Sequence, residues 1–225
     1  MLAVFDRSVA KSPEGLRSPA AEDGGGGGVR PLLEHFAAAH EGAVTIHLGS
    51  SAGALAFSDE KQNPFLPRLF TVMNDIFCLF QGHIENIALL KQQYGLGKTA
   101  NEAIIVIEAY RTLRDRGPFP ASQDADGSVP FFWGTDSEDH LVLSDDVEIV
   151  KKGCGKSYAP FPKGCFFTTS GGLQSFEHPL NEVKAMPRVD SEGQICGATY
   201  KVDVEAKKET GMPRVGSSAN WSSQY

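Results

Sequence analysis

The chain of 225 residues is 41% hydrophobic and 22% charged, which is an ordinary composition for a globular domain with a substantial core. Its net charge of −7 argues against nucleic acids and anionic membrane surfaces as partners, because both are bound mainly through clustered Lys and Arg. No apolar run approaches the roughly 18 residues that a membrane span needs, so a soluble protein is expected.

Four cysteines, Cys78, Cys154, Cys165 and Cys196, occur without a C-x-x-C spacing. With no signal peptide ahead of them, they are expected to be reduced thiols in an intracellular protein. A zinc site using Cys154 and Cys165 is the less favoured alternative, because cysteine ligands of structural zinc usually lie closer together. We therefore expect no cofactor and no metal, and a cytoplasmic location that can extend to the nucleus.

The first predicted strand is Leu2–Phe5. A Gly-rich insertion at about residues 8–30 follows, and it is expected to be mobile because its Ser, Pro and Gly residues cannot bury enough surface to offset their ordering entropy. A short helix is predicted over residues 32–36, directly after Pro31, since proline suits the first helical position.

Two strands, Val44–Leu48 and Ala54–Phe57, are predicted around a turn with the pattern G-x-S-x-G. The same pattern forms the nucleophile elbow of α/β-hydrolases, in which Ser51 would be the catalytic residue. That elbow needs a helix directly after the serine, whereas here a short apolar run leads into a polar, proline-containing loop. A hairpin is the favoured interpretation, and serine hydrolysis through Ser51 is the alternative.

A strand at Phe70–Met73 follows Arg68, and the apolar run Ile76–Phe80 predicts another strand that ends at Gln81-Gly82. Apolar residues spaced three and four positions apart then predict a helix that begins at Ile84.

The next helix is predicted to begin at Thr99, which forms an S/T-x-x-E capping box with Glu102. Ala103 and Ile107 lie on its apolar face. The helix is expected to end at Gly117, because glycine takes the left-handed position after a last helical turn and the following proline blocks continuation.

Two short motifs lie near this helix: Tyr94-Gly95-Leu96 precedes it, and Leu113-Arg114-Asp115-Arg116 forms its predicted last turn. In them the chain resembles the plant aluminium-induced, or stem-specific, proteins with YGL and LRDR motifs, a family that is similar to class II glutamine amidotransferases. The resemblance implies an α+β fold of the Ntn-hydrolase type, an αββα sandwich of two antiparallel sheets between helices. It also implies one domain over residues 1–206, a polar tail over 207–225, and a role in stress or hormone responses.

The chain departs from the family after the LRDR motif. Two strands of the family, roughly 25–30 residues, have no counterpart, because residues 118–123 run directly into the turn Asp124-Ala125-Asp126-Gly127. Loss of two core strands after residue 123 is expected to re-pair the neighbouring strands or to leave open edges. We therefore expect reduced stability and a splice-variant origin.

Beyond this gap, a hairpin is predicted from Val129–Gly134 and Leu141–Leu143, and Ser144-Asp145-Asp146 is expected to cap a helix at Val147–Lys152. The remaining predicted strands are Phe161–Phe167, Leu173–Phe176 and Ile195–Val204.

The resemblance implies that the chain is a pseudoenzyme without a catalytic residue. Amidotransferases of this class use an N-terminal cysteine whose own α-amino group is the base. This chain begins Met1-Leu2, and the methionine is expected to stay in place before so large a residue. Ala100 stands where the family enzymes hold the substrate amino group with an acid. We expect a non-catalytic binding or interaction module, and an active glutamine amidohydrolase is the alternative.

By the same resemblance, three residues are vestigial ligand-binding candidates. Arg68 corresponds to the arginine that holds the glutamine carboxylate, and Gln81 and Gly82 correspond to the oxyanion-hole pair, with glutamine in place of asparagine. The expected partner is a protein, and a small amino-acid-like ligand is the alternative. The sequence leaves open whether the chain forms a homodimer. A third hypothesis is phosphorylation-controlled partner binding through Ser217 and Ser218 of the tail.

Overall fold

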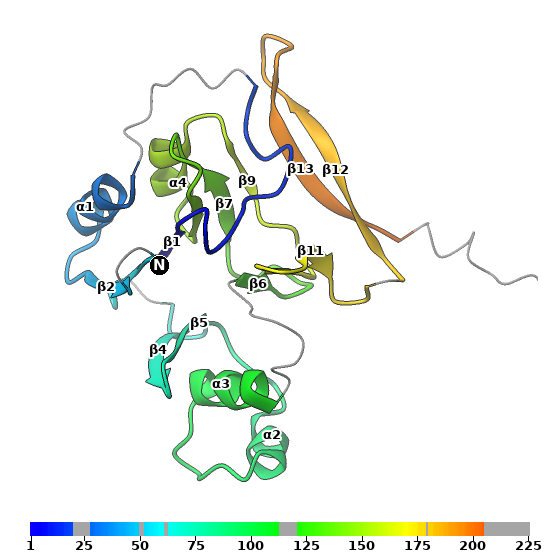
Figure 1. Cartoon of the computed structure of the whole chain (residues 1–225). Coiled ribbons are helices and arrows are strands. Elements are labelled where there is room, and N and C mark those ends of the chain that lie inside the picture. The colour runs from blue at the N-terminus through cyan, green and yellow to red at the C-terminus, as the bar shows by residue number, and fades with distance from the viewer. Residues whose placement is uncertain (20–27, 50–51, 61–62, 113–120, 179, 205–225) are drawn as a thin grey trace, which may run out of the picture.

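The computed structural model describes residues 1–19, 28–49, 52–60, 63–112, 121–178 and 180–204, which form the predicted α+β fold (Figure 1). The described helices are α1 (Val29–Ala39), α2 (Ile87–Gln93), α3 (Glu102–Thr112) and α4 (Val147–Cys154). The described strands are β1 (Leu2–Phe5), β2 (Val44–Leu48), β3 (Gly53–Phe57), β4 (Arg68–Met73), β5 (Ile76–Gln81), β6 (Ala121–Gln123), β7 (Phe132–Thr135), β8 (Leu141–Ser144), β9 (Tyr158–Pro160), β10 (Cys165–Thr168), β11 (Gly172–Ser175), β12 (Glu182–Val189) and β13 (Ile195–Asp203).

The largest sheet is antiparallel and has six strands in the order β2-β3-β1-β8-β7-β9. The apolar strand β1 lies in its interior, between β3 and β8, as the sequence predicts. The hairpins β2–β3 and β7–β8 are confirmed as well. The chain therefore places its first residues in the middle of this sheet.

Helices α1 and α4 cover one face of the sheet. Alternate side chains of β1, Leu2 and Val4, point to this face because successive residues of a strand face opposite sides. They pack against Phe36 of α1 and Ile149 of α4, all within one buried cluster. Asp146 caps α4 by accepting the N–H of Glu148 at 2.9 Å, as the acidic residues before this helix predict.

The opposite face carries the larger core, which centres on Trp133 of β7. Its indole is fully buried and meets Phe161, Phe167 and Tyr200 edge to face. Phe167 comes from β10 and Tyr200 from β13, so this core joins the six-stranded sheet to a second layer of strands. The described layers thus run helices, first sheet, second layer.

Outside the first sheet, the described strands form three separate antiparallel sheets, β11-β10-β6, β12-β13 and β4-β5. The hairpin β12–β13 rises along one side of the body, whereas β4–β5 packs against α3 and projects with α2 and α3 from the opposite end (Figure 1). Separate sheets are what the predicted loss of two strands would leave. That loss itself stays a prediction.

Two helix starts were predicted wrongly. Helix α2 begins at Ile87 rather than Ile84, and α3 begins at Glu102 rather than Thr99. The cap of α3 is Asn101, whose side chain accepts the N–H of Ile104 at 3.0 Å. Asparagine is a stronger N-cap than threonine, so the nearer residue takes the position that the capping-box pattern assigns to Thr99.

Residues 8–19 of the predicted insertion contact the body of the molecule at several points, and their mobility stays a prediction. Ala10 and Leu16 are fully buried, and Leu16 belongs to the core around Trp133. The backbone N–H of Ser18 donates to the hydroxyl of Ser157 at 3.0 Å. Helix α1 also begins before Pro31, at Val29, while residues 20–27 lie outside the described part.

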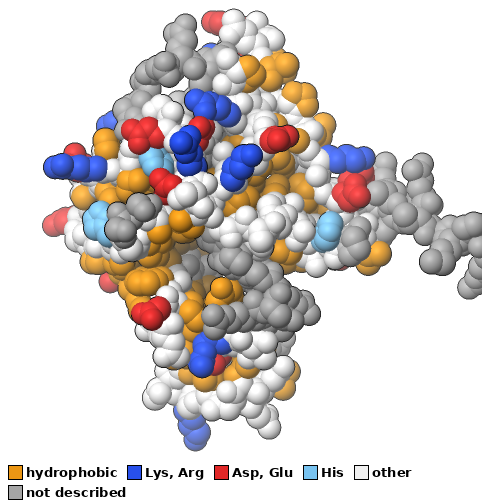
Figure 2. All heavy atoms as spheres, in the orientation of Figure 1, with side chains coloured by type: hydrophobic (Ala, Val, Ile, Leu, Met, Phe, Trp, Pro, Cys, Tyr) orange, Lys and Arg blue, Asp and Glu red, His pale blue; other side chains and the backbone are white. Residues whose placement is uncertain are grey.

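The surface shown in Figure 2 interleaves acidic and basic side chains over the body of the molecule. Among the described residues, no helix is long and apolar enough to cross a membrane.

Candidate functional site

The three vestigial residues predicted from the sequence lie together at the base of the β4–β5 hairpin. Arg68 opens β4 and Gln81 closes β5, and the register of the hairpin pairs them directly. A guanidinium nitrogen of Arg68 donates to Oε1 of Gln81 at 3.4 Å, and Gly82 follows in the chain. The hairpin therefore brings Arg68 and Gln81 together in space, although they are 13 positions apart in the sequence.

Arg68 is already paired with a carboxylate of the same chain. Its guanidinium donates to Oδ2 of Asp145 and to the carbonyl oxygen of Ser58, each at 2.5 Å. The side chains of Arg68 and Asp145 are only 11% and 13% exposed. The Met1 ammonium also contacts Asp145. We call these five residues, Met1, Ser58, Arg68, Gln81 and Asp145, the Arg68–Asp145 cluster.

Asp145 is the functional position that sequence reasoning missed, because it was assigned only to helix capping. Asp146 does the capping, which leaves the carboxylate of Asp145 to pair with Arg68 at the start of β4. The signal in the sequence was the pair of acids before α4, since one cap needs one carboxylate.

The Met1 end of β1 is held by several contacts. The hydroxyl of Ser144 donates to the carbonyl oxygen of Met1 at 2.7 Å. Burial lowers the pKa of the Met1 α-amino group, although the Asp145 carboxylate acts in the opposite direction. The cluster thus joins β1, the start of α4 and the β4–β5 hairpin through polar groups that are largely shielded from water.

The backbone N–H of Gly82 is engaged as well. It donates to the carbonyl oxygen of Pro67 at 3.1 Å, and Gly82 has a φ of 131°, which favours glycine. An oxyanion hole needs donors that are aimed at an empty position where charge develops. The N–H of Gly82 is therefore not free to act as such a donor, and the amide oxygen of Gln81 accepts from Arg68.

Nucleophilic side chains are poorly placed or poorly activated around this cluster. Leu2, which follows Met1 where the related enzymes carry their cysteine, has no nucleophilic atom and is fully buried under the helices. Burial raises the pKa of Cys78 and of Cys165 to about 11 each, and burial together with Asp136 raises the pKa of Cys154 further. Such thiols stay protonated near neutral pH and attack weakly. Ser51 lies outside the described residues, and the strands on both sides of it form a hairpin rather than a strand–helix elbow.

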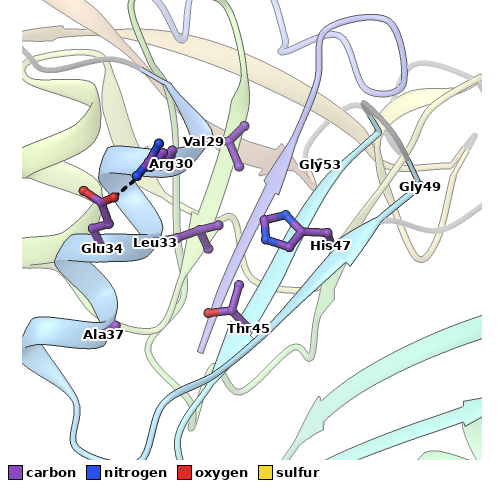
Figure 3. Close-up of a pocket in the computed structure, with 9 residues that line it drawn as sticks. All are labelled: Val29, Arg30, Leu33, Glu34, Ala37, Thr45, His47, Gly49 and Gly53. Carbon is purple, nitrogen blue, oxygen red and sulfur yellow. Dashed lines mark hydrogen bonds and ion pairs between the residues drawn. The ribbon is translucent and has the colours of Figure 1, made fainter.

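A separate groove of about 500 Å³ lies between α1 and the edge strand β2. Val29 and Leu33 of α1 face His47 and Thr45 of β2 across it (Figure 3). Among the residues that the structure describes, no three His, Cys, Asp or Glu side chains come together as a metal site.

The YGL motif has a structural explanation in the described residues, whereas the LRDR motif, residues 113–116, lies outside them. Tyr94 is the C-cap residue that follows α2, and Gly95 comes next with a φ of 64°. The N–H of Gly95 bonds the carbonyl of Gln92 at 3.2 Å, and the N–H of Leu96 bonds the carbonyl of Lys91 at 2.8 Å. These two bonds form a Schellman motif, so the glycine is required by the helix end.

Replacing Gly95 by alanine is expected to lower the free energy of unfolding by about 1 kcal/mol, because the left-handed conformation strains a residue with a Cβ atom. Gly97→Ala is the matched control, since Gly97 lacks a positive φ and an added Cβ would meet open space. Urea unfolding followed by circular dichroism measures both. Equal effects of the two substitutions would contradict the assignment.

The model of a family described as aluminium induced protein matches residues 2–124 and 121–202. The stem-specific protein TSJT1 of Nicotiana tabacum is 38% identical over 131 residues, which are 55% of this chain and 83% of the relative. The two matched segments meet at residues 121–124, next to the position where two strands are predicted to be missing.

Proposed function

The chain belongs to the aluminium-induced protein family, and on that premise we propose that it is a non-catalytic protein of the class II glutamine amidotransferase type. Its role is that of a stress- or hormone-responsive interaction module, located in the cytoplasm and extending to the nucleus. Imaging of a fluorescent fusion checks the location.

The observation that carries this proposal is the internal pairing of Arg68. An arginine that held the carboxylate of a substrate would need a free planar face for two parallel hydrogen bonds. Here the guanidinium is bonded to Asp145 and to the Ser58 carbonyl, and both ionic side chains are nearly excluded from water. Asp145 thus takes the place that a ligand carboxylate would take.

Two further features support the proposed lack of catalytic activity. The N–H of Gly82 is bonded to the Pro67 carbonyl, so an oxyanion would have to break that bond before it gained a donor. The buried apolar side chains of Leu2 and Ala100 supply no nucleophile and no acid at the positions where the related enzymes carry them. The cluster is better suited to hold strands together than to turn over a substrate.

The same pairing favours a protein partner over an amino-acid-like ligand. A glutamine molecule would have to displace Asp145 from Arg68 and leave that largely buried carboxylate with the Met1 ammonium as its cation, which is unfavourable. We therefore place Arg68, Gln81 and Gly82 in a structural role, and a small ligand is the weaker alternative.

The purified chain is expected to release no ammonia from glutamine above the buffer rate and no product from a p-nitrophenyl ester. Isothermal titration with millimolar glutamine is expected to show no heat of binding. Release of ammonia from glutamine by the wild type would instead establish a glutamine amidohydrolase, and ester turnover that disappears in Ser51→Ala would establish a serine hydrolase. Either result would overturn the proposal.

A further inference from the structure

Strand β2 forms one edge of the six-stranded sheet in the part of the chain that the structure describes. Among the described strands it pairs only with β3. Its sequence, Val44-Thr45-Ile46-His47-Leu48, contains no Lys, Arg, Asp, Glu or Pro, the residues that usually keep an edge strand from pairing with another chain. The opposite edge is protected, because β9 is three residues long, ends at Pro160 and contacts β13.

The side chains of β2 alternate in a way that suits a further strand. Thr45 and His47 are exposed and lie on the helix-covered side of the sheet, opposite Ala56 and Ala54 of β3. Val44 lies on the other side and is 47% exposed. A strand added to β2 would bond the outward N–H and C=O groups and would cover these three side chains.

The groove beside β2 extends the same surface. Helix α1 packs on β3. Thr45 and His47 of β2 therefore stay exposed and line the groove opposite Val29 and Leu33 (Figure 3). Arg30 and Glu34 stand on the rim, paired with each other at 2.9 Å and with side chains 90% and 65% exposed. The rim therefore carries both signs of charge one helical turn apart.

We propose that this surface is the interface of a homodimer in which β2 of two copies pairs antiparallel about a two-fold axis through Ile46. Opposite residues then lie on the same face, so Thr45 meets His47 of the second copy and Val44 meets Leu48. The two six-stranded sheets become one continuous sheet. The two grooves meet under a pair of α1 helices, where Arg30 can pair with Glu34 of the other copy.

A second copy suits this surface better than a different partner does. An isologous interface must be complementary to itself, and a rim with one cation and one anion meets that requirement. A strongly acidic or strongly basic partner would match only one of the two charges. The inference rests on the β2 edge alone and is independent of the proposed lack of catalysis.

The test uses the full chain in size-exclusion chromatography with light scattering. At about 100 µM the wild type is expected to show twice the chain mass of 24.2 kDa. The double substitution Thr45→Lys/His47→Lys places like charges opposite each other, and Thr45→Glu/His47→Glu does the same with the other sign. Each is expected to raise the dimer dissociation constant at least about tenfold. Mixing the two variants is expected to restore the dimer, because opposite charges then face each other.

Met186→Lys is the matched control, because Met186 is 46% exposed on β12, away from the β2 edge. It is expected to leave the dimer unchanged. A wild type that stays monomeric at every concentration would overturn the proposal. A dimer whose dissociation constant is unchanged by the charged substitutions in β2 would also overturn it, as would a dimer that is weakened only by Met186→Lys.

Hydrogen exchange of the wild type gives a second measurement that does not depend on the variants folding. Amides of β2 are expected to exchange more slowly at high than at low chain concentration, whereas those of β12 are expected to be unaffected. Equal exchange of β2 at both concentrations would also overturn the proposal.

Discussion

Replacing Trp133 by alanine is expected to lower the free energy of unfolding by about 3–5 kcal/mol, a large part of the stability of an ordinary domain. The indole is fully buried, and ring centroids of Phe161, Tyr200 and Phe167 lie 4.8, 5.3 and 6.0 Å away. Because these rings come from the loop before β10, from β13 and from β10 itself, the cavity would open between the first sheet and the second layer. The effect is therefore expected to be global.

Urea unfolding followed by far-UV circular dichroism measures this loss. Phe65→Ala is the matched control, because the Phe65 side chain is 84% exposed and its removal leaves no cavity. Trp133→Phe is expected to lose less than Trp133→Ala, since an aromatic ring stays in the cluster. A Trp133→Ala protein within about 1 kcal/mol of the wild type would contradict the packing described here.

Local signals in the sequence were sufficient for much of the first sheet. Apolar runs of strand length predicted β1, the hairpins β2–β3 and β7–β8, and the helix that follows β8, because each depends on neighbours in the chain. The central position of β1 came from the family resemblance. It could not come from a five-residue window, since the partners of β1 lie 48–54 residues away in β3 and 136–142 residues away in β8.

Gly53 shows why one pattern can be interpreted in two ways. The G-x-S-x-G pattern favours glycine at this position for a hydrolase elbow as well as for a hairpin. In the structure, a Cβ atom on Gly53 would lie 2.0 Å from the backbone carbonyl oxygen of Val4. The close approach of β1 to β3 therefore requires the glycine, and this contact is invisible in the local sequence.

The candidate site was predicted only in part, for a similar reason. The resemblance identified Arg68, Gln81 and Gly82, and the register of β4–β5 brings them together. Asp145 was missed because its partner Arg68 lies 77 residues away, while its own neighbourhood suggested a helix cap. The resemblance predicted a vestigial ligand site, and the pairing of Arg68 with Asp145 instead favours a structural one.

Breaking this pair is expected to have the other large effect. Asp145→Ala should lower the free energy of unfolding by about 3–5 kcal/mol, because it leaves the Arg68 guanidinium without a carboxylate in a site nearly excluded from water. Arg68→Ala should lower it by less, because the Met1 ammonium still contacts Asp145. The double variant should lose less than the sum, with a coupling of about 1–3 kcal/mol, since neither charge is then left behind. Urea unfolding of the four proteins completes the double-mutant cycle. Additive losses would mean that the two side chains act independently.

Chemical rescue separates this structural role from a ligand site. If Asp145 occupies the position of a carboxylate ligand, millimolar acetate should raise the melting temperature of Asp145→Ala by binding Arg68. Asp146→Ala is the matched control, because its carboxylate caps α4 and its loss should cost about 1 kcal/mol without any response to acetate. Glutamine that stabilises Asp145→Ala but not the wild type would show that the internal carboxylate closes a site that can still hold an amino acid. If neither acetate nor glutamine stabilises Asp145→Ala, the space around Arg68 collapses once Asp145 is removed, and the cluster serves the fold alone.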